Sequence, residues 1–137
     1  MLKSACFTGH RPQDLNGFNP QDNVEMLIKL RETIIDHIEN KNVTTFISGM
    51  ALGVDQWVAK IILKLRDTEY PHIKLIAAIP CSKQYSKWES YNQNEWHFIT
   101  NRVDETVYVS NEPYTNWCMQ KRNEWMVDNS QYIIAVW

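Results

Sequence analysis

The fold is decided by the junction at residues 47–55, which reads Ile47-Ser48-Gly49-Met50-Ala51-Leu52-Gly53-Val54-Asp55. Apolar, strand-like residues break at a small residue plus glycine, and the chain then enters an amphipathic helix. A similar break occurs near the amino terminus, at Phe7-Thr8-Gly9-His10-Arg11-Pro12. The strands of a parallel α/β sheet end together at one edge, where ligands bind. The two segments therefore predict a small-molecule pocket, suited to a ligand that carries phosphate.

On both sides of this junction, strand patterns alternate with helix patterns along the chain. Five segments are expected as strands, at residues 4–9, 43–48, 73–79, 105–110 and 131–136. Four segments are expected as helices, at residues 22–40, 50–66, 83–101 and 114–129. The alternation predicts right-handed crossovers and a parallel sheet covered on both faces. We expect an α/β fold, a three-layer Rossmann-like sandwich with five mainly parallel strands in the order 3-2-1-4-5. The switch point then lies between the first and fourth strands.

Length and composition favour one ordinary globular domain, residues 1–137, with 44% hydrophobic residues and a net charge of −2. The sequence has no Lys/Arg run, so nucleic acid is an unlikely partner. No apolar stretch approaches the ~20 residues that cross a bilayer, so we expect a cytoplasmic protein without a membrane partner. The widely separated Cys6, Cys81 and Cys118 are expected to be reduced and structural.

The junction at residues 48–55 resembles an anion site. Two glycines and small residues leave backbone N–H groups unpaired at the start of a helix, where the helix dipole is positive. No Gly-Lys-Ser/Thr follows, so the segment is not a Walker A loop, and it is not a Gly-x-Gly-x-x-Gly motif. Asp55 either complements the dipole or accepts hydrogen bonds from a ribose or base. We expect Ser48, Gly49, Met50 and Gly53 to contact the ligand with it.

The amino-terminal break offers a second set of contacts. Gly9 allows close approach of the backbone to a ligand, and Thr8 supplies a hydroxyl. Arg11 carries a forked cation that suits phosphate, and His10 is a donor or an acid–base group. The alternative is a plain turn with a solvated histidine and arginine.

A third set lies on the predicted helix at residues 114–129. Arg122 shares one helical face with Met119 and Met126, which favours a pocket role or a packed aliphatic stem over free solvation. Asn123 follows it and joins the predicted site.

Two further residues follow the end of the predicted third strand. Pro80 stops this strand at the ligand edge. Trp88, like Trp117 after the predicted fourth strand, could stack on a base, although packing is the commoner role of tryptophan. The sequence has no Gly-x-Ser-x-Gly elbow, no His-Glu-x-x-His motif and no carboxylate-rich metal cluster. We therefore predict neither a metal nor a cofactor.

Three motifs in the same order resemble the YpsA/YoqJ group of bacterial and phage proteins, at residues 6–12, 48–55 and 122–130. That group belongs to the SLOG superfamily, with the DNA-processing protein DprA and the LOG-type phosphoribohydrolases. The resemblance spans essentially the whole chain and implies a Rossmann-like fold that binds a nucleotide or nucleotide-derived ligand. It carries the ligand-contact role onto Thr8, Gly9, Arg11, Ser48, Gly49, Gly53, Asp55 and Arg122.

The sequence departs from that family pattern at its end. The family usually continues with a Gly-Gly-Thr turn and a last helix, whereas this sequence stops at Trp137 and has no counterpart of the LOG glutamate. We therefore expect a sensor or sequestering protein rather than an enzyme, and a homodimer would cover the exposed sheet face. One alternative is hydrolysis of nucleoside monophosphates, with Asp55, Glu89 or Arg122 as catalytic candidates. Another is DprA-like binding of single-stranded DNA.

Overall fold

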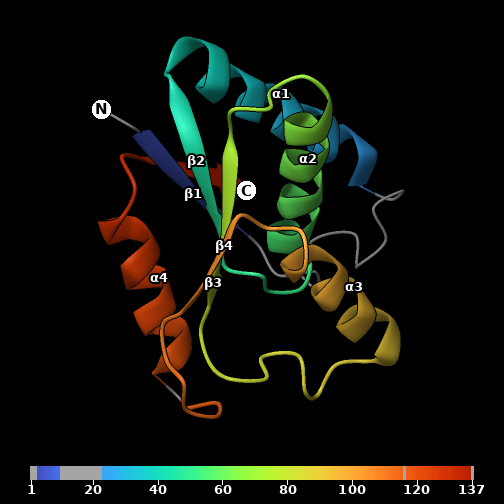
Figure 1. Ribbon diagram of the computed structural model, residues 1–137, viewed down its shortest axis with the longest axis vertical. Helices are drawn as coiled ribbons and strands as arrows, with labels where there is room; N and C mark the ends of the chain where they lie inside the picture. The colour runs from blue at the N-terminus through green and yellow to red at the C-terminus, as the bar shows by residue number, and fades with distance from the viewer. Residues whose placement is uncertain (1–2, 10–22, 116, 137) are drawn as a thin grey trace.

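A computed structural model describes residues 3–9, 23–115 and 117–136, and shows an α/β fold with a five-stranded, all-parallel sheet (Figure 1). The strands are β1 (Lys3–Gly9), β2 (Val43–Ser48), β3 (Lys74–Ile79), β4 (Glu105–Tyr108) and β5 (Tyr132–Val136). The helices are α1 (Val24–Asn40), α2 (Val54–Thr68), α3 (Ser90–Thr100) and α4 (Cys118–Asp128). The predicted fold class and the alternation of strand and helix are confirmed.

Helices cover both faces of the sheet, so the predicted three layers are present. Figure 1 shows α4 on one side and α1, α2 and α3 on the other. The larger core joins α1, α2 and α3 to one sheet face, where Ile34, Phe46 and Leu75 are completely buried. The smaller core joins Met126 of α4 to the other face through Cys6, Ile47 and Ala78. Alternating strand side chains point to opposite faces, which explains the two cores.

The strand order is β4-β3-β2-β1-β5, which corrects the predicted order 3-2-1-4-5. The neighbours 3-2-1 are right, but β4 pairs with β3, and β5 lies beyond β1. The switch point is therefore between β1 and β5, instead of between the first and fourth strands. Hydrophobic periodicity predicts that a strand exists and does not say which strand it pairs with. A signal was present, since Glu105–Tyr108 is short and partly polar, as edge strands commonly are.

Two helices, α2 and α3, begin later in the chain than the sequence pattern predicts. The predicted helix at 83–101 begins at Ser90, because residues 82–87 form turns in which Lys83 has a φ of 53°. The predicted helix at 50–66 begins at Val54, and residues 50–53 form the turn that leads into it. Both differences fall at the carboxyl edge of the sheet, where the chain makes turns instead of entering a helix directly.

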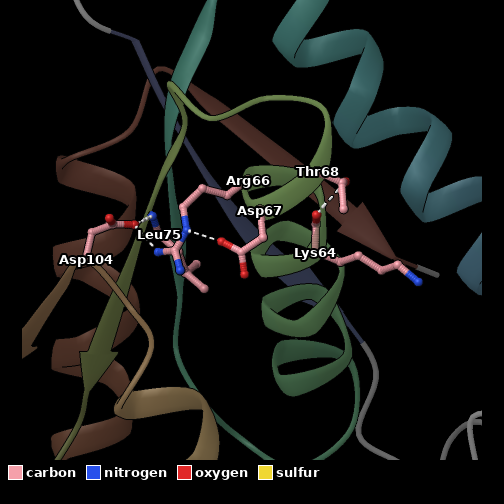
Figure 2. Close-up of polar contacts among 6 residues, drawn as sticks. All are labelled: Lys64, Arg66, Asp67, Thr68, Leu75 and Asp104. Atoms are coloured by element: carbon pink, nitrogen blue, oxygen red, sulfur yellow. Dashed lines mark hydrogen bonds and ion pairs between the residues drawn. The ribbon is translucent and has the colours of Figure 1, made fainter.

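A cluster of hydrogen bonds and ion pairs lies at the amino edge of the sheet, opposite the carboxyl edge (Figure 2). One carboxylate oxygen of Asp104 accepts hydrogen bonds from Arg66 Nη1 and from the backbone N–H of Leu75, both at 2.8 Å. Arg66 Nε also donates to Asp67 at 3.2 Å. The cluster ties the end of α2 to the first residues of β3 and to the turn before β4, while the carboxyl edge carries the candidate site.

Among the helices that the structure describes, none is long and apolar enough to cross a membrane.

Candidate functional site

The β2–α2 junction folds back on the first turn of α2. Ser48 Oγ donates to the backbone oxygen of Asp55 at 2.8 Å and accepts from the N–H of Met50 at 3.3 Å. The carboxylate of Asp55 accepts from the N–H of Ala51 at 3.2 Å. Met50 has a φ of 60°, which is uncommon outside glycine, and Gly53 has a φ of 90°. These hydrogen bonds hold the turn in a conformation that the chain would not adopt by itself.

Arg122 approaches this turn from α4. Its side chain is almost completely buried, with 4% exposed, although arginine is normally a surface residue. Nη1 donates to the backbone oxygen of Gly49, and Nε donates to Asn123 Oδ1 at 2.8 Å. No ion pair among the described residues includes Arg122. A buried cation is thus held mainly by neutral oxygens, which favours an anion nearby.

Burial shifts the pKa values of two charged groups here. It lowers the pKa of the Arg122 guanidinium, and the negative charge of Asp55 opposes this change. It raises the pKa of the Asp55 carboxyl, against the effects of Arg122 and of the Ala51 N–H. The two groups stabilise each other's charge at a distance, without a contact that counts as an ion pair.

Gly49 packs directly against the guanidinium of Arg122. A Cβ atom at this position would lie 2.7 Å from Cζ and 2.9 Å from Nε of Arg122, inside the normal contact distance. The glycine therefore serves close packing against the guanidinium and leaves the backbone oxygen open to donors. Gln84 Nε2 also donates to that oxygen, at 3.2 Å. Trp96 Nε1 in turn donates to Gln84 Oε1 at 2.9 Å, which holds the Gln84 side chain in place.

A cavity with a volume of about 600 Å³ lies between α2 and α3. It opens beside the first turns of both helices. Its lining is Leu52, Gly53, Gln56, Trp57, Lys60, Lys87, Trp88, Glu89, Tyr91, Asn92 and Glu95. The predicted residues Gly53, Trp88 and Glu89 are among them.

Most of the residues that line the cavity were not predicted from the sequence, although their spacing is a pattern that could have indicated them. Residues 56, 57 and 60 lie on one face of α2, and residues 91, 92 and 95 have the same spacing on α3, while residues 53 and 88 directly precede these helices. Each face mixes aromatic and charged residues, unlike a core stripe. Gln84 carried no signal, because it is one polar residue in a turn.

The other predicted site residues are spread along the same edge. Thr8 is exposed at the end of β1, Pro80 is buried directly after β3, and Asn123 is exposed on α4. Gly9 ends β1. His10 and Arg11 lie outside the described residues.

Two cysteines meet at this edge. Cys81 follows Pro80, Cys118 begins α4, and both are buried and free. Burial, together with the neighbouring Cys118 thiol, raises the pKa of Cys81 to about 11, while Arg122 acts to lower it. Because Cys81 and Cys118 are far apart in the sequence, their proximity could not be predicted from it. Within the described ranges no group of three or more metal-ligating side chains occurs.

Comparison with known proteins gives one consistent set of relatives. The family model YpsA, described as the YspA SLOG family, matches residues 5–137. A UPF0398 protein of Brevibacillus brevis is 30% identical over 140 residues, covering 100% of this chain and 73% of the relative. A UPF0398 protein of Levilactobacillus brevis is 32% identical, covering 99% and 72%. A Bacillus cereus UPF0398 protein is 28% identical, covering 99% and 74%.

Proposed function

The chain belongs to the YspA SLOG family, and on that premise we propose that it binds a nucleotide or nucleotide-derived small ligand at the carboxyl edge of its sheet. The observation that supports this most is the cavity between α2 and α3, which combines aromatic surfaces with lysines. Its volume of about 600 Å³ lies within the range of small-molecule sites. We assign the base of the ligand to the aromatic side chains of this cavity, and its phosphate to the start of α2.

The aromatic side chains provide the surface for a base. Trp88 is half-buried and can present a ring face without losing its packing, whereas Trp57 is largely buried and forms part of the cavity wall. Tyr91 stands at the rim with 69% of its surface exposed. Stacking of a base on an aromatic side chain contributes about 1–3 kcal/mol. We assign the base to the surface of Trp88.

The start of α2 provides the surface for a phosphate. Gly53 lines the cavity, and α2 begins there without a side-chain cap, which leaves early N–H groups to a ligand. Lys87 lines the same cavity and takes part in no ion pair of the described residues. An anion at this end would also lessen the cost of burying Arg122 behind the turn.

Two carboxylates near the cavity, Asp55 and Glu95, suit binding without turnover, whereas Glu89 also lines it and is the acid that the assay for adenine release below addresses. Asp55 accepts from the Ala51 N–H, and Glu95 accepts from Lys60 Nζ at 2.8 Å and from the Tyr91 hydroxyl at 3.0 Å. Carboxylates engaged in this way are poorly placed to activate a water molecule. We therefore assign the chain a sensing or sequestering role.

Calorimetric titration with AMP, ADP and ADP-ribose tests the proposal. Trp88→Ala should weaken binding about tenfold or more, and Trp88→Phe should keep most of the affinity, because a ring remains. Trp117→Ala is the matched control, since Trp117 is 67% exposed and does not line the cavity. Binding that is equal in all three variants would contradict the assigned site.

Two other measurements decide between the functions. Native mass spectrometry of freshly purified protein should detect a bound nucleotide, and an empty protein that binds none of the three compounds would overturn the proposal. Release of free adenine from AMP, followed by chromatography, would instead establish hydrolysis.

A further inference from the structure

Gln56 is the most deeply buried polar side chain in the lining of the cavity between α2 and α3, with 6% of its surface exposed. Its Nε2 donates to the backbone oxygen of Met50 at 3.4 Å, in the turn that precedes α2. The two ends of the amide cannot exchange places, because Oε1 would then face another acceptor. The turn therefore fixes the orientation of the amide, and Oε1 is the end that remains for a ligand.

The oxygen of this amide has no donor in the protein. Among the residues that the structure describes, none donates a hydrogen bond to Gln56 Oε1. It is not one of the described side-chain oxygens that are sealed from solvent without a partner, which are Thr44 Oγ1 and Ser130 Oγ. Oε1 therefore keeps contact with solvent where Gln56 lines the cavity. A ligand that expels solvent from the cavity must donate to this oxygen, because a buried acceptor without a donor is costly.

The other polar side chains of the lining impose a weaker requirement on a ligand. Glu95 accepts hydrogen bonds from Lys60 and Tyr91, so these three groups already have partners in the protein. Glu89 is exposed, and water can replace a lost partner there at little cost. Gln56 is thus the lining residue at which a missing donor on the ligand costs most.

The position of Gln56 indicates which part of the ligand supplies the donor. Gln56 follows Gly53 by three residues, which is about 4.5 Å along the axis of a helix. The phosphate is assigned to the start of α2, and the base to Trp88 on the other side of the cavity. The ribose joins these two groups and carries hydroxyl donors. Because the amide is neutral, it accepts from a hydroxyl without repelling a phosphate nearby, as a carboxylate would.

We propose that Gln56 Oε1 accepts a hydrogen bond from a ribose hydroxyl of the ligand, and that the site thereby selects nucleotides with a complete 2′,3′-diol. The inference rests on the proposed function and adds the sugar to it. Gln56 is a specificity-determining residue in this arrangement, and the start of α2 and Trp88 provide the general affinity for a nucleotide.

Calorimetric titration tests the selection of the sugar. The tightest-binding of AMP, ADP and ADP-ribose is compared with its two analogues that lack the 2′- or the 3′-hydroxyl of the adenosine. At least one analogue should bind the wild type about tenfold more weakly, because Oε1 loses its donor. Gln56→Met removes the acceptor with little change in volume, and should bind the ligand and both analogues equally. Gln120→Met is the matched control, since Gln120 is exposed on α4 outside the cavity, and should keep the wild-type selectivity.

The outcomes separate this inference from the proposed function. A wild type that binds the ligand and both analogues equally would overturn the inference and leave nucleotide binding in place. Selectivity that persists in Gln56→Met, with circular dichroism showing a folded protein, would overturn the assignment to Gln56. If Gln56→Met does not fold, Gln56→Glu keeps an acceptor oxygen and should keep the selectivity, and its loss in that variant would contradict the inference. A protein that binds none of the three compounds would overturn the proposed function and this inference together.

Discussion

The guanidinium of Arg122 lies against the backbone of Gly49, 73 residues earlier in the chain, and leaves no room for a side chain there. Nη1 donates to the Gly49 oxygen, so a helix on one face of the sheet holds a turn at the carboxyl edge. The turn in turn leads into α2 and the cavity beside it. A charge buried in α4 thus helps to shape the surface that we assign to the ligand.

Gly49→Ala should destabilise the fold by about 1–3 kcal/mol, because the new methyl group would overlap the guanidinium. Urea unfolding measures the change. Gly49 is not among the residues with positive φ, so backbone strain does not contribute to the cost. Adding Arg122→Met should remove most of the penalty in a double-mutant cycle. An equal penalty with and without Arg122 would contradict the packing explanation.

Asp55→Asn should change the pH dependence of stability. Burial raises the folded-state pKa of Asp55 above its unfolded value, so its contribution to stability is full at low pH and is lost as pH rises through the folded pKa. The asparagine variant should therefore be more stable than the wild type at pH 7, and the difference should close below about pH 4. Thermal unfolding between these values measures it. A variant that is less stable at neutral pH would show that Arg122 outweighs burial.

Asp104→Ala should cost about 1–3 kcal/mol, since it removes the acceptor for the buried N–H of Leu75 and for Arg66. Asp67→Ala removes a second partner of Arg66 whose side chain is 61% exposed, and should cost less than about 0.5 kcal/mol. Urea unfolding compares the two. Equal losses would mean that the charge of Arg66, and not the Leu75 hydrogen bond, sets the cost (Figure 2).

Cys81 should react slowly with thiol reagents at neutral pH. Because its pKa is raised to about 11, the rate of alkylation should keep rising with pH beyond the ordinary cysteine pKa of about 8.5. The measurement uses a Cys6→Ser background with peptide mapping of Cys81. Cys118→Ala should shift the profile to lower pH, since the neighbouring thiol is one cause of the raised pKa. A profile that levels off near pH 8.5 would contradict the buried thiol pair.

The turn between β2 and α2 and the burial of Arg122 could be predicted because each depends on residues that are close together in the sequence. The small residues and glycines at 48–53 predicted the break between β2 and α2, and the methionines that flank Arg122 predicted that it would not be freely solvated. Gln84 and Lys87 could not be found in this way, because they reach the site from turns that have no periodic pattern. The start of α3 was missed for the same reason.

Hydrophobic periodicity and glycine breaks are properties of neighbouring residues, so the sequence alone was enough to predict the class of fold and the break that follows β2. The three-dimensional arrangement was needed to show which strands are neighbours, that Arg122 packs on Gly49, and that Cys81 lies beside Cys118. These relationships join residues far apart in the chain. They depend on how α4 crosses the sheet to reach β5, which no local pattern encodes.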